Sequence, residues 1–229
     1  MLSVLVWFAS APPLWVQVAI ATLWVGGVIA LAEALNRLGN VGSESVRKIV
    51  HIGIGNVILL AWWLQIPTWL GVSASALFSL VALLSYRLPI LPGINSVGRK
   101  SLGTFFYAVS FGVLIARFWD TQPQYAIVGI LVMTWGDGLA ALVGKQWGKH
   151  PYRLWGIEKS WEGSGTMLVA SYGVCFCVLL ATSASLNTVA LAALGVAIAA
   201  TSLEAFSKYG IDNLTVPIAS AFVALLLTQ

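Results

Sequence analysis

The chain has 229 residues, of which 59% are hydrophobic and only 9% are charged, and its formal net charge is +4. Its apolar runs are about 15 to 22 residues long, close to the roughly 20 that a helix needs to cross a bilayer. This pattern excludes a soluble globular domain, whose helices would show polar faces. The polar segments carry no basic stripe interleaved with aromatic residues, so the positive charge gives no argument for nucleic acid as a partner. We predict an all-α, polytopic membrane protein with about seven or eight transmembrane helices, in which residues 1–229 form a single domain.

Eight apolar segments are expected to be membrane-spanning helices. In chain order they cover residues 14–35, 50–66, 68–86, 102–118, 124–143, 166–182, 188–203 and 213–228. Seven spans are the alternative, because Pro67 could be a kink within one hairpin and the last segment is short. The leading segment Met1–Pro13 is apolar but has no basic region before it, so we do not expect a cleaved signal peptide.

Lys and Arg concentrate on one side of this arrangement. Eleven of the twelve fall in or beside the odd-numbered loops: Arg37, Arg47, Lys48, Arg87, Arg99, Lys100, Lys145, Lys149, Arg153, Lys159 and Lys208. Because cytoplasmic loops accumulate Lys and Arg, we expect these loops inside and the N-terminus outside, and Arg47 and Lys48 could be no more than such anchors. Seven of the eight carboxylates gather on the same side, which the orientation rule does not require.

One carboxylate of the fifth segment is a candidate functional residue. Asp137 lies between Gly136 and Gly138, near the inner end of an otherwise apolar span. A carboxylate at this depth is costly unless it faces a partner, a metal ion or water. The structural alternative is an acid at a helix end that pairs with Lys145 or Lys159.

The stretch after Asp137 is rich in glycine and cations. It is not a Walker A loop, because 138–145 is one residue too long and Gln146 stands where a Ser or Thr would bind magnesium. Its backbone N–H groups could still bind phosphate, and nearby carboxylates could hold Mg²⁺ together with the phosphates of a nucleotide. The glycines concerned are Gly144, Gly148, Gly156, Gly163 and Gly165. Alternatively, Ala140 and Gly144 simply allow two helices to approach closely.

The sequence resembles the polyprenol kinase family in four blocks that occur in the family's order. They are RKIVHIG at 47–53, GDGLAALVGKQWGK at 136–149, EKSWEGS at 158–164 and EAFSKYGIDNLTVP at 204–217. Within the family, the chain is most similar to the phytol kinases of photosynthetic organisms, while dolichol kinases and CTP-dependent diacylglycerol kinases are more distant. The resemblance covers most of the chain from Ser43 onward.

The resemblance implies a CTP-dependent, Mg²⁺-requiring transfer of phosphate to the hydroxyl of a long-chain isoprenoid alcohol. The implied partners are the alcohol, the nucleotide and the lipid bilayer. The cation distribution puts the expected active site on the cytoplasmic face, of a plasma or thylakoid membrane if the source is a photosynthetic organism. The matching blocks also supply the candidate site residues. These are Arg47, Lys48, His51, Asp137, Gly144, Lys145, Lys159, Ser160, Glu162, Gly163, Ser164, Glu204, Asp212 and Asn213.

The chemistry of phosphoryl transfer suggests roles within this set, because the reaction mainly needs positioning and neutralisation of charge. We expect Asp137, with Glu162 or Asp212, to hold Mg²⁺. Phosphate contacts are expected from Arg47, Lys48, Gly144, Lys145, Lys159, Ser160, Gly163 and Ser164. One carboxylate must orient or deprotonate the alcohol, and Asp212 is slightly preferred over Glu204.

Simpler interpretations compete at some positions. Glu158 and Glu162 are one helical turn apart and could form a solvated face. Glu204 could pair with Lys208 at i,i+4, an arrangement worth only about 0.3 to 0.5 kcal/mol.

Two other functions remain open. A membrane cytidylyltransferase acting on a lipid phosphate would use the same metal, nucleotide and membrane side, but would release pyrophosphate rather than CDP. A transporter would place charges along a path near the bilayer midplane, and the middles of most spans carry none.

Overall fold

The computed structural model describes residues 11–38, 42–86, 101–182 and 185–229. Within these ranges the chain is almost entirely helical, which confirms the predicted all-α class. The helices are α1 (Leu14–Leu38), α2 (Ser43–Gly55), α3 (Val57–Trp63), α4 (Thr68–Ser85), α6 (Gly103–Phe118), α7 (Pro123–Leu131), α8 (Gly138–Trp147), α9 (Trp161–Thr182), α10 (Leu186–Ala205) and α11 (Asp212–Thr228). A π-helical turn, Val132–Asp137, joins α7 to α8 and is called the π turn below.

The described helices form a polytopic membrane protein, and the number of crossing segments agrees with the predicted seven to eight. Six segments are long and apolar enough to cross a membrane by themselves. Two of these six are composite: α2 continues into α3, and α7 continues through the π turn into α8. The remaining helices, α6 and α11, are apolar but shorter, with 16 and 17 residues.

Two helices begin earlier than hydropathy predicts. The second span starts at residue 43 instead of 50, and Glu44 pairs there with Arg47, with 2.6 Å between Oε1 and Nη2, so these charges do not end the helix. The sixth span starts at residue 161 instead of 166, because an acid such as Glu162 is favourable in the first turn of a helix. Pro67 directly precedes α4, where it separates two helices rather than kinking one.

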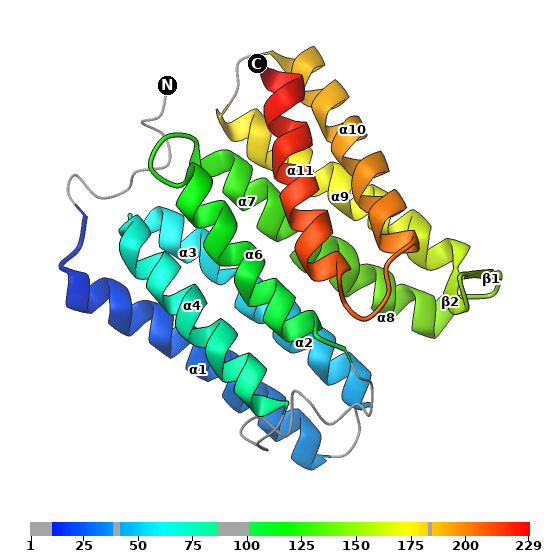
Figure 1. Ribbon diagram of the computed structural model, residues 1–229, viewed down its shortest axis with the longest axis horizontal. Coiled ribbons are helices and arrows are strands. Elements are labelled where there is room, and N and C mark those ends of the chain that lie inside the picture. The colour runs from blue at the N-terminus through cyan, green and yellow to red at the C-terminus, as the bar shows by residue number, and fades with distance from the viewer. Residues whose placement is uncertain (1–10, 39–41, 87–100, 183–184) are drawn as a thin grey trace.

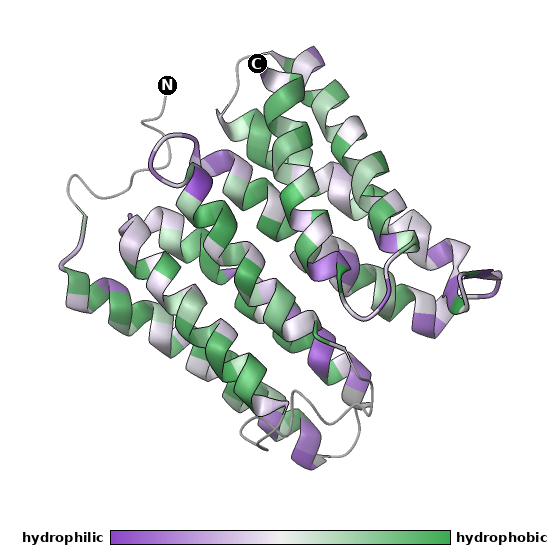
Figure 2. Ribbon diagram, viewed as in Figure 1, coloured by the Kyte–Doolittle hydropathy of each residue, from purple (hydrophilic) through white to green (hydrophobic). Residues whose placement is uncertain are grey.

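The connections gather at two ends of the helix bundle (Figure 1). At one end, the backbone N–H of Leu102 donates to the carbonyl of Tyr209 over 3.1 Å, which joins the start of α6 to the α10–α11 connection. At the opposite end, the indole N–H of Trp119 donates to the carbonyl of Ile66 over 2.8 Å. Figure 2 shows that hydrophilic residues lie mainly near these ends, while the middles of the helices are hydrophobic.

The first of these ends, called the charged end below, carries most of the cations. Of the nine Lys and Arg within the described residues, only Arg117 lies at the opposite end. The other eight are Arg37, Arg47, Lys48, Lys145, Lys149, Arg153, Lys159 and Lys208. The predicted cations Arg87, Arg99 and Lys100 lie outside the described residues. The expected one-sided distribution therefore holds wherever the structure describes it.

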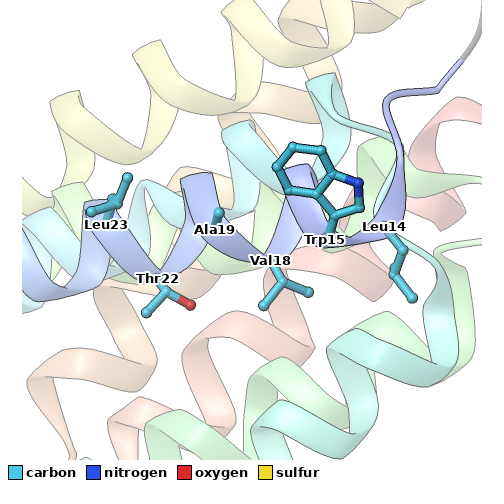
Figure 3. A pocket seen from close by; sticks show the side chains of 6 residues that line it. All are labelled: Leu14, Trp15, Val18, Ala19, Thr22 and Leu23. Atoms are coloured by element: carbon cyan, nitrogen blue, oxygen red, sulfur yellow. The ribbon is translucent and has the colours of Figure 1, made fainter.

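The centre of the bundle is formed by α7 and the π turn. All residues from Tyr125 to Thr134 are buried, and α6, α9 and α11 pack around them. α1 lies at the outside instead, and an open apolar groove of about 640 Å³ follows its first turns (Figure 3). The groove is lined by Leu14, Trp15, Val18, Ala19, Thr22 and Leu23. Such an apolar surface faces the lipid chains in a membrane.

A short hairpin at the charged end was not predicted. β1 (Pro151–Leu154) pairs antiparallel with β2 (Ile157–Ser160), and Tyr152 lies opposite Lys159. The two turn residues, Trp155 and Gly156, have φ values of 47° and 80°, as a tight two-residue turn with two left-handed positions requires. This hairpin connects α8 to α9 and carries Lys159.

Candidate active site

The first ion pair of the site joins α2 to the π turn. Lys48 Nζ lies 2.5 Å from Asp137 Oδ2, and the two side chains are only 5% and 10% exposed. His51, one turn further along α2, places Nε2 3.7 Å from the same carboxylate oxygen. The proposed pairing of Asp137 with Lys145 or Lys159 is therefore wrong, because the partner comes from a helix that precedes it by 89 residues.

The second ion pair joins the hairpin to the end of α10. The ammonium group of Lys159 donates to both the side-chain carboxylate and the backbone carbonyl of Glu204. Both side chains are largely buried, with 17% and 11% exposed. The suggested pairing of Glu204 with Lys208 is wrong, because Glu204 binds a cation from another segment.

A third carboxylate, Asp212, interacts with members of both ion pairs. It is close enough to interact electrostatically with Asp137, Lys48 and Lys159. Its own position at the start of α11 is fixed locally: its backbone N–H donates to Ser207 Oγ over 2.8 Å. Its Oδ1 accepts from both the backbone and the side-chain amide of Asn213, each over 3.1 Å. The structure thus brings together two cations and three carboxylates from five segments, counting Glu204.

The connection that carries Asp212 to this place depends on a glycine contact. Gly210 has φ +83°, a left-handed conformation that favours glycine. A β-carbon there would lie 2.6 Å from both Cα and N of Gly103, the first residue of α6. Asn213 donates from Nδ2 to the carbonyl of Gly210 over 3.3 Å. Close backbone contact between the loop and α6 therefore sets where α11 begins.

Arg47 and Glu162 lie at the edge of this cluster. Arg47 pairs with Glu44, although it still interacts electrostatically with Asp137 and Asp212. Glu162 bonds His150 instead, with 2.6 Å between Oε1 and Nδ1. Its assignment as a metal ligand stays a prediction.

The glycine and serine candidates pack α8 against α9. A β-carbon at Gly144 would lie 3.5 Å from Cα of Gly163 and 3.0 Å from Oγ of Ser160. The same hydroxyl accepts a bond of 3.1 Å from the N–H of Gly163, and Ser164 bonds the hydroxyl of Tyr152 over 2.6 Å. The close approach of helices expected from the small residues is thus present, and a phosphate contact for these residues stays a prediction.

Lys145 differs from the other site candidates because it is exposed on α8. Its Nζ would lie 3.2 Å from a β-carbon built at Gly42, so it faces the start of α2. It can approach a ligand from solvent, whereas Lys48 and Lys159 are already bound to acids.

The donor set fits Mg²⁺ through Asp137 and Asp212. Among the described residues, no group of three or more His, Cys, Asp or Glu side chains forms a metal cluster. Mg²⁺ does not require one, since it commonly binds one or two carboxylates together with water and substrate phosphates. Asp137, with Asp212 in electrostatic range of it, is compatible with that mode of binding.

Sequence reasoning missed several polar residues that form hydrogen bonds at the π turn that carries Asp137. Tyr107 on α6, Thr134 in the π turn and Asn56 between α2 and α3 all bond within this region. The available signal was the presence of polar side chains within apolar spans, which also occurs where hydroxyls bond only their own helix.

Comparison with known proteins gives the family. The chain is 53% identical over 215 residues to a phytol kinase of Synechocystis sp., covering 93% of this chain and 92% of that protein. It is 28% identical over 233 residues to phytol kinase 1, chloroplastic, of Arabidopsis thaliana, covering 88% and 73%. It is 30% identical over 155 residues to the farnesol kinase, chloroplastic, of the same plant, covering 60% and 48%. No protein-family model and no solved structure matches the chain. From the identity and coverage of the first of these relatives, the chain belongs to the polyprenol kinase family and is related to its phytol kinases.

Proposed function

We propose that this membrane kinase transfers the γ-phosphoryl group of CTP to the hydroxyl of a long-chain isoprenoid alcohol such as phytol, giving a prenyl phosphate and CDP. The alcohol class is supported by relatives named as phytol and farnesol kinases. CTP as donor is supported by the four sequence blocks that resemble the family. A bundle of apolar helices suits a substrate whose chain is dissolved in lipid.

The observation that carries the proposal is the pair of buried lysine–carboxylate contacts beside Asp212. Buried ions are costly, so charge kept at the end of an apolar bundle indicates a functional site. Lys48 and Lys159 can donate to phosphate oxygens, because an ammonium group exchanges one anionic partner for another. Asp137 would hold Mg²⁺ together with water and the nucleotide phosphates, whose charge the ion would neutralise.

The remaining chemistry is a proton transfer and a displacement. Asp212 is partly exposed at the start of α11, at the charged end of the bundle, where a prenyl alcohol would present its hydroxyl. Its carboxylate accepts the hydroxyl proton as the alcohol oxygen forms a bond to the γ-phosphorus. The bond between that phosphorus and the bridging oxygen breaks, and CDP leaves with the electron pair. The lysines stabilise the charge that develops on the phosphate oxygens.

The proposed site faces the cytoplasm. Support comes from the charged end, which carries eight of the nine Lys and Arg among the described residues, since such residues accumulate in cytoplasmic loops. Cytosolic nucleotide can reach this end directly. The membrane concerned is proposed to be a plasma or thylakoid membrane.

The test is a purified-protein assay with labelled CTP, ATP and GTP against phytol, geranylgeraniol and diacylglycerol. We expect alcohol-dependent release of CDP, with an isoprenoid alcohol preferred over diacylglycerol. Release of pyrophosphate would identify a cytidylyltransferase instead. Equal rates with and without alcohol would overturn the proposal.

A further inference from the structure

The π turn that carries Asp137 interrupts a segment that is otherwise α-helical. α7 ends at Leu131, the turn covers Val132–Asp137, and α8 continues from Gly138. A π turn holds one more residue than an α turn and is rare, so it persists where the surroundings stabilise it. Those surroundings are α9, α11, α2 and α10, which pack against the turn, and Tyr107 of α6, which bonds Thr134.

Three consecutive residues of the π turn are bound by side chains from outside it. The carbonyl of Met133 faces His51 Nε2 over 3.3 Å. Thr134 Oγ1 bonds the hydroxyl of Tyr107 over 2.6 Å. Trp135 donates from its indole nitrogen to Asn56 over 3.2 Å. These three hydrogen bonds fix how the π turn is rotated about the helix axis. They therefore also fix the direction in which Asp137, two residues later, points.

The bond between Tyr107 and Thr134 has a defined direction. Thr134 Oγ1 donates its one proton to the carbonyl of Ile130 over 2.6 Å, so the phenol of Tyr107 must be the donor to Thr134. Both hydroxyl groups are buried. A β-carbon at Gly55 would overlap both hydroxyl groups, so the backbone of α2 packs directly against them at this glycine. Solvent does not replace a bond enclosed in this way.

Tyr107 also contacts the group that borders Asp137. Its ring centroid lies 4.2 Å from that of His51, whose Nε2 is 3.7 Å from the Asp137 carboxylate. His51 follows Lys48 by three residues on α2, which places both on the same helix face. Tyr107 is therefore connected through His51 to Asp137, and His51 shares a helix face with Lys48.

We propose that Tyr107 and Thr134 are positioning residues that keep Val132–Asp137 in the π-helical conformation, so that Asp137 faces Lys48. The inference rests on the proposed function for its kinetic consequence. If the π turn relaxed to an α turn, the register would change by one residue and Asp137 would rotate by roughly 100° about the helix axis. The carboxylate would then leave Lys48, whose ammonium group it holds at 2.5 Å.

The test compares Tyr107→Phe and Thr134→Val with a matched control. Tyr125→Phe is that control, because Tyr125 lies on the same span and its hydroxyl bonds Thr228 over 2.7 Å at the opposite end of the bundle. We expect Tyr107→Phe and Thr134→Val to lower kcat about tenfold, with a higher Mg²⁺ concentration for half-activation and an unchanged KM for the alcohol. Thr134→Ser keeps the accepting hydroxyl and should retain wild-type kcat.

Hydrogen exchange supplies a readout that does not depend on the reaction. Amides of the π turn should exchange faster in Tyr107→Phe than in wild type, while Tyr125→Phe leaves them unchanged. Unchanged exchange there in Tyr107→Phe, or a kcat and Mg²⁺ response equal to those of Tyr125→Phe, overturns the inference. Absence of alcohol phosphorylation by the wild type overturns the proposed function instead, and the exchange result still decides whether Tyr107 holds the turn.

Discussion

Lys48 and Asp137 are 89 residues apart in the sequence, and their side chains form a buried ion pair with 2.5 Å between Nζ and Oδ2. Because both side chains are buried, each charge is stabilised mainly by the other and only weakly by water. Removing one member of such a pair typically costs about 3 to 5 kcal/mol, because the other charge is left buried and unpaired. A single substitution here therefore changes stability as well as chemistry, and the two effects need separate measurements.

The first prediction concerns Asp137→Asn. The substitution keeps the size of the side chain and removes the charge that would hold Mg²⁺. We expect turnover with CTP and phytol to fall by about 100-fold or more across a magnesium titration. We also expect a lower thermal midpoint in detergent, since Lys48 loses its partner. Near-normal turnover at the Mg²⁺ concentration that saturates the wild type would show that Asp137 is not a metal ligand.

The double variant Lys48→Met/Asp137→Asn separates the two effects. Replacing both charges should recover part of the lost stability, because no buried charge is then left without its partner. Turnover should stay low. Recovery of turnover in the double variant would mean that Asp137 serves only to neutralise Lys48.

The second prediction concerns Lys159→Ala. Lys159 binds Glu204 in the structure, and we propose that it donates to a nucleotide phosphate. A charge-assisted bond is worth about 1.5 to 3 kcal/mol, so kcat/KM for the nucleotide should fall about 10- to 150-fold. Lys159→Arg need not restore it, because a planar guanidinium places its donors differently.

The matched control for Lys159 is Lys149→Ala. Lys149 lies in the same α8–α9 connection but is exposed, so its charge contributes mainly to the surface potential. Its removal should change the kinetics by less than about threefold at moderate salt. If the two alanine variants lowered kcat/KM equally, Lys159 would contribute only to the general positive charge of this end and would not bind a phosphate itself.

Much of the fold followed from the sequence because lipid imposes simple rules. Apolar runs predicted the helical spans, and the side on which cations gather predicted one charged end. The sequence blocks also brought Lys48, Asp137, Lys159, Glu204 and Asp212 into one site, since each lies near the same end of its own span. These predictions use only the position of a residue along a helix.

Pairing within the site could not be predicted, because it depends on how helices rotate and pack. Lys145 and Lys159, both nearer in sequence, were the expected partners of Asp137, yet it bonds Lys48 because α2 packs against the π turn and α8. The π turn itself gives no signal in hydropathy, since the span 123–147 has a high mean hydropathy of 1.9. The hairpin was missed because each strand has only four residues and Trp155 occupies a left-handed position that a bulky side chain rarely adopts.

The third prediction concerns Gly210→Ala. The substitution introduces a β-carbon at a left-handed position and 2.6 Å from the backbone of Gly103, so both strain and overlap result. We expect a loss of about 2 kcal/mol or more in unfolding free energy. Turnover of the folded fraction should also fall, because the same loop sets the start of α11 and the place of Asp212.

Gly173→Ala is the control for this change. Gly173 lies within α9, and a β-carbon there would meet no atom within 4 Å. Alanine is the better helix former, so stability should stay the same or rise by up to about 1 kcal/mol. If Gly210→Ala behaved like Gly173→Ala in both unfolding and turnover, the contact between the loop and α6 would have no role in placing Asp212.

The last prediction concerns the side of the membrane on which the charged end lies. Gln146, exposed on α8, is replaced by Cys in a background where Cys175 and Cys177 of α9 are Ala. An impermeant thiol reagent should label Gln146→Cys only after the inner face is opened, because the charged end carries the cations that cytoplasmic loops accumulate. Thr121→Cys reports on the opposite end, where Thr121 is exposed between α6 and α7, and should be labelled in intact cells. The reverse pattern would place the N-terminus inside and the kinase site outside. The two positions lie at opposite ends of the same helices. Labelling of both from one side of the membrane would therefore contradict the arrangement in which these helices cross the bilayer.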